Sequence, residues 1–349
     1  MNNELISKLC DLHDLSDEEL GCLINERTPE DAKRLAAEAS ELRDRVYGKK
    51  VFMRGLIEFT SYCRNDCLYC GLRRSNHNAQ RYRLTKEEIL SCAENGYMLG
   101  FRTFVLQGGE DPYFTDDVLC DIVSSLKEIY PDCAVTLSVG ERSLGSYKQL
   151  YYAGADRYLL RHETADADHY GILHPKELKL SHRMECLSDL KSIGYQTGCG
   201  FMVGSPYQST ESIVKDLRFI KSFSPEMVGI GPFIPHCDTP YRNQKAGTLE
   251  FTLFLLSIVR LMLPDVLLPA TTALGTIAEN GRELGIMAGA NVVMPNLSPN
   301  DVRKKYSLYD NKLCSGDEAA ENVNELRRRI ESTGYKLVTD RGDHIRFSK

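Results

Sequence analysis

Residues 51–70 read VFMRGLIEFTSYCRNDCLYC, a β-rich apolar run that passes directly into three closely spaced cysteines. The run 51–59 has the composition of a buried strand. Cys63, Cys67 and Cys70 follow it within a stretch of eight residues. The rest of the chain repeats this plan, in which a buried strand is followed by polar or glycine-rich residues.

Eight β-rich runs alternate with amphipathic segments. Strands are predicted at 51–59, 103–108, 134–139, 157–162, 196–203, 226–233, 266–272 and 291–296. Helices are predicted between them, near 85–99, 115–130, 143–153, 181–193, 209–222, 248–262 and 275–288. This α/β alternation implies a parallel sheet with right-handed crossovers, and eight units that close on themselves form a complete (β/α)8 TIM barrel. The alternative is an open doubly wound sheet, which the absence of a Gly-x-Gly-x-x-Gly helix start disfavours.

Helical sequence precedes the predicted barrel, and a short tail follows it. Ser16-Asp-Glu-Glu19 is a capping-box pattern, and Thr28-Pro29 predicts the start of a helix that ends near Gly48. The tail predicts a helix over Asp317–Thr333 and then a hairpin that turns at Arg341-Gly342. We expect N-terminal helices packing on the barrel over 1–50, the barrel over 51–300 and the tail over 301–349.

The composition narrows the class of protein. The chain has 349 residues, of which 42% are hydrophobic, with a net charge of −6. This charge argues against nucleic acid or an anionic membrane as the main partner. No apolar run approaches the roughly 20 residues that a membrane span needs, and the N-terminus lacks a signal-peptide pattern. We therefore expect a cytoplasmic protein, in which the nine cysteines outside the cluster are buried thiols.

Polar or glycine- and proline-rich residues end each predicted strand. In a TIM barrel, the site lies at this carboxyl end of the strands. The cysteine loop ends the first strand. The other strand ends are 107–111, 138–140, 161–164, 204–206, 232–236, 271–272 and 294–296.

The cysteines leave one ligand position open. A structural zinc site and a four-iron cluster both normally take four protein ligands, and only three cysteines are clustered here. The spacing Cys-x3-Cys-x2-Cys, with Tyr69 before the last cysteine, resembles the signature of the radical S-adenosylmethionine (SAM) superfamily. The resemblance implies a [4Fe-4S] cluster whose fourth iron binds SAM, and reductive cleavage of SAM to a 5′-deoxyadenosyl radical. A zinc site is the alternative.

The resemblance also implies a SAM pocket. Gly108-Gly109-Glu110 resembles the superfamily segment that meets the ammonium group of SAM, where glycine permits close backbone approach. Arg183 resembles the arginine that meets the carboxylate. Glu163 and Ser138 resemble positions that hold the ribose and methionine parts, and Tyr69 and Ile230 would flank the adenine. Each of these could instead be a surface charge or a core contact.

Longer stretches resemble one family closely, the HydE family of [FeFe]-hydrogenase maturases. They are CLYCGLRRSN, RYRLT, VLQGGEDPY, GADRYLLRHETA, MVGIGPFIPHCDTP, PATTALGT and GANVVMPN, and together they cover nearly the whole predicted barrel. Biotin synthase and methylornithine synthase resemble the chain more distantly. Methylornithine synthase shares RYRLT-like and GEDPY-like segments but differs at Gly71-Leu-Arg73.

The family implies a small anionic organometallic substrate. This is an iron–cysteine complex with carbonyl and cyanide ligands, received from the maturase HydG and passed on towards HydF after attack by the radical. Cations, hydroxyls and amides suit such a ligand. The implied substrate residues are Arg54, Gln107, Arg161, Met227, Thr271, Thr272, Met294 and Tyr309. For Arg54 and Arg161, a structural ion pair is the alternative. A ferredoxin or flavodoxin is the expected electron donor.

The tail departs from some members of the family. These carry a second cluster held by three further cysteines, and only Cys314 matches here, so we expect no second cluster. Three classes of function remain open: a radical SAM maturase, a radical mutase acting on an amino acid, and a non-catalytic iron–sulfur or zinc scaffold.

Overall fold

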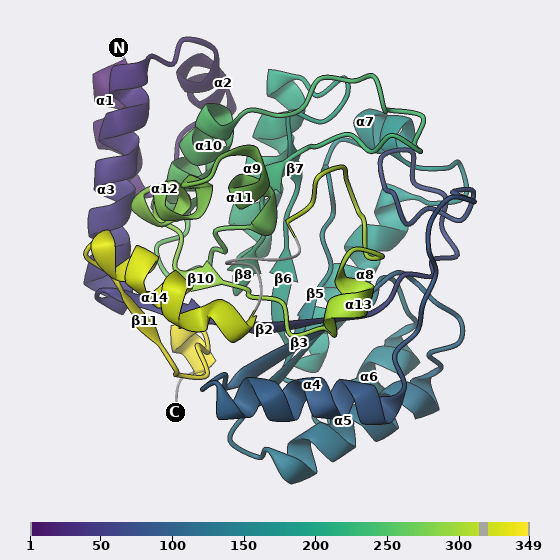
Figure 1. Ribbon diagram of the computed structural model, residues 1–349. Helices are drawn as coiled ribbons and strands as arrows, with labels where there is room; N and C mark the ends of the chain where they lie inside the picture. The colour runs from purple at the N-terminus through teal and green to yellow at the C-terminus, as the bar shows by residue number, and fades with distance from the viewer. Residues whose placement is uncertain (1, 314–319, 348–349) are drawn as a thin grey trace.

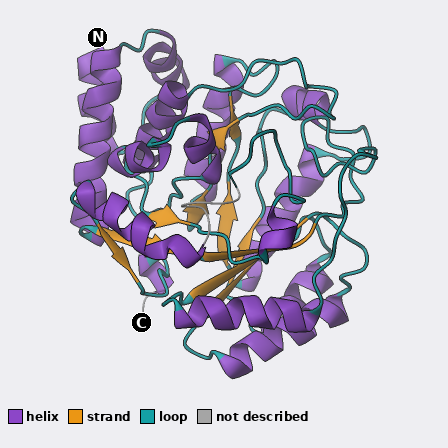
Figure 2. Cartoon of the chain, viewed as in Figure 1, coloured by secondary structure: helices purple, strands orange, loops and turns teal. Residues whose placement is uncertain are grey.

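A parallel sheet forms the centre of the protein, with helices outside it (Figures 1 and 2). The computed structural model describes residues 2–313 and 320–347. Six strands are hydrogen-bonded in the order β2-β3-β4-β5-β6-β8. Their bounds are β2 Gly55–Thr60, β3 Thr103–Gly108, β4 Ala134–Ser138, β5 Arg157–Leu159, β6 Gln196–Cys199 and β8 Met227–Val228.

Single parallel bridges carry the sheet on from β8 and back to the first strand. Leu267 pairs with Met227, and Pro269 pairs with Val292 in β10 (Val292–Val293). Asn296 then pairs with Leu56 in β2, while β10 pairs with β1 (Lys50–Met53). The predicted TIM-barrel fold is confirmed, and all of these pairings are parallel.

Several predicted strands are shorter than the sequence suggested. The segment 266–272 makes only the two bridges at Leu267 and Pro269, because proline has no N–H to donate to the ladder. The segments 196–203 and 226–233 are each interrupted, giving β7 (Met202–Val203) and β9 (Gly231–Pro232) as a separate pair. At the interruption, a Cβ on Gly200 would lie 2.0 Å from the carbonyl oxygen of Gly229. Only glycine permits this close approach.

Six predicted helices are confirmed: α4 Lys86–Met98, α5 Asp116–Ile129, α6 Leu144–Tyr152, α8 Leu180–Ile193, α9 Thr210–Phe223 and α10 Leu249–Met262. The predicted helix 275–288 is wrong as one element. It is two helices, α11 (Thr272–Ile277) and α12 (Gly281–Met287), because Gly281 packs tightly on the backbone of Leu274. The short helices α7 (Ala167–Leu173) and α13 (Asn300–Arg303) were not predicted.

Three helices precede the barrel: α1 (Asn2–Leu12), α2 (Asp17–Asn25) and α3 (Pro29–Tyr47). The capping box at Ser16 and the helix start at Thr28-Pro29 are confirmed for α2 and α3, and Thr28 also forms a capping box with Asp31. The helices α3 and α10 lie side by side in Figure 1. The buried Arg43 joins α3 to the barrel, since it donates to the carbonyl oxygens of Ile286 and Ala290. None of the helices within the described ranges is long and apolar enough to cross a membrane.

The tail contains η2 (Ala320–Asn322), α14 (Val323–Ser332), β11 (Lys336–Val338) and η3 (Ile345–Phe347). The predicted tail helix is confirmed over α14, while residues 317–319 lie outside the described residues. The predicted hairpin is wrong. β11 pairs in parallel with β1, and the chain beyond it turns to the amino ends of the barrel strands, where Asp343 pairs with Arg157.

Candidate functional site

The clustered cysteines lie in the loop that follows β2, at the carboxyl end of the sheet. Burial raises the pKa of the Cys63 and Cys67 thiols, and it raises that of Cys70 to about 12. A coordinated metal counteracts this effect because it takes the thiolate form.

The spacing of the cysteines differs from that around a single ion. Across the described part of the chain, the one trio of potential ligands whose ligand atoms all lie within 4.8 Å of one another is His236, Cys237 and Asp310. The three cluster sulfurs are therefore not all this close. Thiolates on one zinc ion would lie about 3.8 Å apart, given Zn–S bonds of about 2.3 Å. The arrangement favours a multi-iron cluster over the zinc alternative.

Arg81 holds the cysteine loop together, a role that the sequence did not predict. Its guanidinium donates to the carbonyl oxygens of Ser61, Leu72 (3.0 Å), Arg73 (2.8 Å) and Asn76 (3.2 Å). These four carbonyls flank the cysteines on both sides. The available signal was the position of Arg81 in the quoted RYRLT stretch.

The predicted glycine segment touches the cysteine loop. A Cβ on Gly109 would lie 2.2 Å from the carbonyl oxygen of Tyr62 and 2.7 Å from Cβ of Cys63. The Glu110 carbonyl oxygen accepts the N–H of Arg64 at 2.9 Å. The strand end and the cluster loop are thus in backbone contact, which only a residue without a side chain allows at Gly109.

Arg183 lies beside the cluster loop and is charged. It forms an ion pair with Glu141 and donates to the carbonyl oxygen of Arg161 at 2.7 Å. Burial by itself lowers the pKa of Arg183, but Tyr170 and Glu141 raise it above its ordinary value. Glu141, which orients this guanidinium, is a site residue that the sequence did not predict.

Glu163 has an unusual backbone conformation. Its φ of 65° lies in the left-handed region that non-glycine residues rarely adopt. Its carboxylate lies 3.1 Å from the guanidinium of Arg161. Such strained residues cluster at functional sites. The strain at Glu163 therefore agrees with its predicted place in the SAM pocket. It does not identify the part of SAM that Glu163 would contact.

The predicted adenine neighbours are enclosed. The Tyr69 hydroxyl lies 3.3 Å from Nε2 of His174, and its ring packs with Met202 and Phe233 at the ends of two strands. Ile230 is fully buried. The structure thus places both side chains among strand ends on the cluster side.

One group of predicted substrate and SAM residues lies at the carboxyl level of the barrel. Gln107 and Ser138 are register partners across β3 and β4, and Glu58 is the partner of Gln107 on β2. The buried Glu58 forms an ion pair of 2.7 Å with Lys312. Glu58 and Lys312 were not predicted. The signal for Glu58 was an acidic residue inside an apolar strand.

Thr271 and Arg161 contribute buried polar atoms to the same level of the barrel. Within the described ranges, Thr271 Oγ1 and Arg161 Nε have no hydrogen-bond partner. Oγ1 of Thr136, on β4, also has no hydrogen-bond partner in the described structure, but it lies two residues deeper than Ser138; it was not predicted. Buried polar atoms normally have partners, so these atoms are available to hydrogen-bond a ligand in the barrel.

The remaining predicted residues at this end lie near the barrel mouth. Thr272 is the first residue of α11. Tyr309 belongs to a loop that is tied to the cysteine loop, because Gly71 N–H donates to the carbonyl oxygen of Leu308 at 2.9 Å. This loop also carries Lys312.

A second group of predicted substrate residues lies deeper. Arg54, Met227 and Met294 belong to the level of Thr103, four residues before Gln107 on β3. At about 3.3 Å per residue, this is about 13 Å along the strand. Arg54 is buried and donates to Sδ of Met227 at 3.0 Å. The predicted substrate residues are therefore divided between two levels of the barrel.

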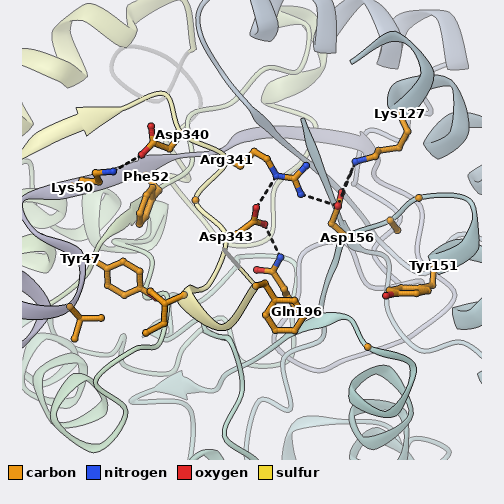
Figure 3. Close-up of a pocket in the computed structure, with 17 residues that line it drawn as sticks. Tyr47, Lys50, Phe52, Lys127, Tyr151, Asp156, Gln196, Asp340, Arg341 and Asp343 are labelled. Atoms are coloured by element: carbon orange, nitrogen blue, oxygen red, sulfur yellow. Dashed lines mark hydrogen bonds and ion pairs between the residues drawn. The ribbon is translucent and has the colours of Figure 1, made fainter. Parts of the chain in front are cut away.

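A large cavity lies at the amino ends of the strands, opposite the cysteines. Its volume is about 1000 Å³. Tail residues and the first residues of the strands line it (Figure 3). No predicted site residue faces this cavity.

Comparisons with known proteins agree with this geometry. Residues 57–220 match the Radical SAM superfamily model. The chain is 46% identical over 308 residues to "[FeFe] hydrogenase maturase subunit HydE" of Thermotoga maritima, which covers 88% of each chain. It is 30% identical to the 3-methylornithine synthase of Methanosarcina barkeri over 96% of this chain and 93% of that protein. The crystal structure of methylornithine synthase (PylB) superposes with a TM-score of 0.84 at 28% identity, covering 96% of this chain and 97% of that chain.

Proposed function

The chain belongs to the HydE family of radical SAM enzymes, and from this premise we propose that it acts on a small anionic iron–cysteine complex during hydrogenase maturation. The family implies one [4Fe-4S] cluster and SAM. When bound, these two supply an electron and a 5′-deoxyadenosyl radical. Cysteine sulfurs that are not all within 4.8 Å of one another fit the cluster, and the close backbone approach at Gly109 fits SAM.

The residues of this chain would divide the binding of SAM among them. Cys63, Cys67 and Cys70 would hold three irons and leave the fourth open. The charged Arg183 would attract the carboxylate of SAM, and Glu141 holds its guanidinium in place.

Further residues would complete the pocket. The backbone at Gly108–Glu110 would meet the ammonium group, with Ser138 and Glu163 holding the ribose and methionine parts. Tyr69 and Ile230 would exclude water around the adenine.

Buried cations carry the proposal of an anionic substrate. Arg54 is 5% exposed, and its Nε has no hydrogen-bond partner in the described structure. No carboxylate of the described chain lies within ion-pair distance of it. Arg161 has one carboxylate neighbour, Glu163, and an unpartnered Nε. A buried cation without compensation is costly, so an anion inside the barrel would stabilise Arg54.

Other predicted residues would add neutral contacts. Gln107, Thr271 and Thr272 offer amide and hydroxyl groups to cyanide or carboxylate acceptors, while Met227, Met294 and Tyr309 would form walls. The unpartnered Thr271 Oγ1 supports this role most directly.

An amino-acid mutase is the second candidate, since the superposition on methylornithine synthase includes 97% of the residues of that protein. The two functions differ in substrate charge and metal content. The 46% identity to a HydE protein favours the first.

One experiment separates the candidates. Reconstituted protein with SAM and dithionite is given either the iron–cysteine carbonyl/cyanide complex or free amino acids, and 5′-deoxyadenosine is measured. We expect the complex, and not an amino acid, to increase 5′-deoxyadenosine formation. R161Q should weaken this response about tenfold, because a hydrogen bond to a charged group contributes about 1.5–3 kcal/mol.

Arg27 provides the matched control, because it lies in the turn between α2 and α3 and stacks on Phe251, away from the barrel interior. R27Q should respond like the wild type. Stimulation by an amino acid alone would overturn the proposal in favour of the mutase.

We further propose a cytoplasmic setting with HydG and HydF as partners, a ferredoxin or flavodoxin as electron donor, and no second cluster. Cys314, on which the last point depends, lies outside the described residues. Iron analysis of a Cys63, Cys67 and Cys70 triple variant tests it, and four surviving irons would contradict it. The division at residues 50 and 300 stays a prediction.

A further inference from the structure

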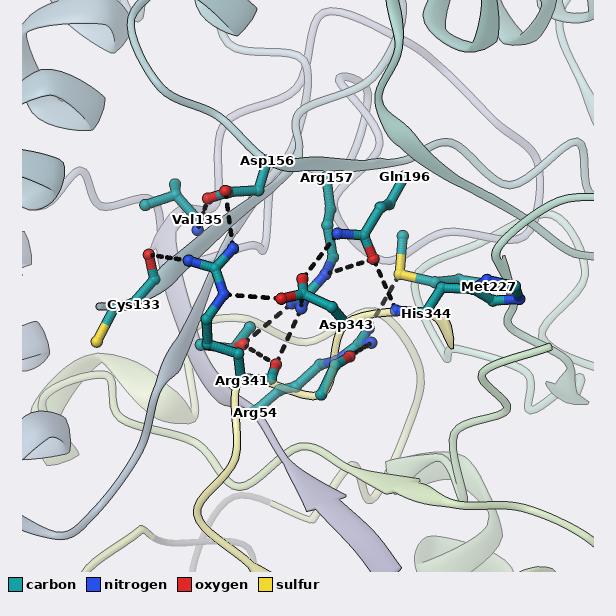
Figure 4. Close-up of polar contacts among 12 residues, drawn as sticks. Arg54, Cys133, Val135, Asp156, Arg157, Gln196, Met227, Arg341, Asp343 and His344 are labelled. Atoms are coloured by element: carbon teal, nitrogen blue, oxygen red, sulfur yellow. Dashed lines mark hydrogen bonds and ion pairs between the residues drawn. The ribbon is translucent and has the colours of Figure 1, made fainter. Parts of the chain in front are cut away.

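The tail closes the barrel at the amino ends of its strands. Residues 340–344, here called the floor segment, contact the first residues of three strands (Figure 4). Arg157 of β5 donates to the carbonyl oxygen of Arg341 at 2.9 Å, and Thr103 of β3 donates to the same oxygen at 2.7 Å. Gln196 of β6 accepts the N–H of His344 at 2.9 Å.

Asp343 is the anionic centre of this closure. Its carboxylate accepts from Arg157 at 2.7 Å, from Gln196 at 2.7 Å and from Arg341 at 2.8 Å (Figures 3 and 4). Arg341 also pairs with Asp156 at 2.9 Å. The carboxylate of Asp343 thus occupies a place between two guanidinium groups where a small anion would also fit.

The floor segment is held by charges and hydrogen bonds more than by apolar packing. Of residues 339–347, only Gly342 and His344 are buried. The apolar residues Ile345 and Phe347 are 44% and 39% exposed. Segments with few buried apolar contacts open at a lower free-energy cost than the core. Ion pairs regain hydration when they open, which further reduces this cost.

Cations lie on both sides of the floor segment. Inside, Arg54 donates to the carbonyl oxygen of Gly342 at 3.3 Å and has no carboxylate partner in the described chain. In the wall, Arg157 is fully buried. Outside, Arg341 lines the cavity of about 1000 Å³, together with Lys50 and Lys127, which form ion pairs with Asp340 and Asp156. A path through the floor would therefore be lined by guanidinium groups and lead into this cavity.

We infer that the floor segment is a releasable plug and that the barrel floor is a port through which small anions enter or leave, with Asp343 as the carboxylate that they displace. Removal of Asp343 leaves Arg157 without its carboxylate, and an incoming anion restores the compensation. Anion binding and plug opening are therefore linked. The inference rests on the proposed function only for the identity of the natural cargo.

Hydrogen exchange of the complete protein, followed by mass spectrometry, tests this port with acetate as the probe. When the acetate concentration is twice the Kd of acetate for the open form, the population of the open form should rise about threefold. The exchange rate of amides 339–347 should rise by the same factor. Exchange in α14 should stay unchanged. D343N should exchange faster without acetate and should respond to acetate less than the wild type does, because acetate no longer has to displace a carboxylate from Arg157 and Arg341.

Asp340 supplies the control, since it lies in the same segment but pairs with Lys50 at the surface. D340N should respond to acetate like the wild type. If D343N fails to fold, R341Q replaces it, because it removes the outer partner of the same carboxylate.

Two outcomes would overturn the port. One is exchange in 339–347 that is as slow as in β3 with and without acetate. The other is faster exchange in D343N with no acetate response in the wild type. In that case Asp343 would only stabilise the closed segment. The readout needs no turnover, so a failure of the proposed function would leave it intact.

Discussion

Single residues divide into those that a motif reveals and those that only the folded chain reveals. Cys63, Cys67, Cys70 and Gly109 stand in short motifs whose spacing carries their chemistry. Arg81 acts through backbone carbonyls, and Lys312 meets Glu58, which lies 254 residues before it in the chain. Such contacts have no local sequence signal, which explains why the cluster could be predicted and its supports could not.

Arg81 offers a test at this scale. R81Q should lower the iron retained after reconstitution and gel filtration, because hydrogen bonds from a charged donor contribute about 1.5–3 kcal/mol each. R81K should restore part of the iron, since it keeps the charge but not the fork of donors. Arg74 lies in the same loop, is exposed and has no described side-chain partner, so R74Q should retain iron normally. Equal iron retention in R81Q and the wild type would contradict the proposed role of Arg81 in holding the cysteine loop.

Elements were predicted well where periodicity and caps agree, and poorly where tertiary contacts decide. The helices α4, α5 and α9 begin at side-chain caps that are visible in the sequence. The tail hairpin failed because β11 found a better partner in β1, and the segment after it is drawn to buried arginines. The strand at 266–272 failed because Pro269 cannot complete the ladder.

The capping box of α4 can be measured alone. Thr85 Oγ1 accepts the Glu88 N–H at 3.2 Å, and the Glu88 carboxylate accepts the Thr85 N–H at 2.7 Å. T85A should lower the free energy of unfolding by about 1 kcal/mol. Urea unfolding checks this value, with T85S as the control that keeps the hydroxyl. Equal urea midpoints for T85A and T85S would show that the Thr85 hydroxyl does not stabilise the protein.

The tail should respond to acid. Burial by itself raises the pKa of Asp343, but Arg157, Arg341 and Gln196 lower it more, to about 2. Because the pKa is lower in the folded state than the ordinary value of about 3.9, the stabilisation is present above that value and is lost as the pH falls towards 2. The stability difference between wild type and D343N should therefore shrink below about pH 4. Urea unfolding at pH 6, 4 and 3 measures it, and a difference that stays constant would contradict the assignment.

On the scale of the whole molecule, the barrel has two different ends. The cysteine loop and the loop of Leu308 close the carboxyl end around the proposed cluster and SAM, while the floor segment closes the amino end with ion pairs. The eight-unit alternation predicted the barrel itself. Its closure by single bridges, and the tail that seals it, depend on packing between segments far apart in the chain.

The central claim is that three cysteines leave one iron free to bind SAM for reductive cleavage. Anaerobically reconstituted protein is mixed with SAM and dithionite, and 5′-deoxyadenosine is quantified by chromatography. The wild type should form 5′-deoxyadenosine, and C67A should form none above background. A wild-type protein that holds its full iron and binds SAM, yet forms no 5′-deoxyadenosine, would contradict the account.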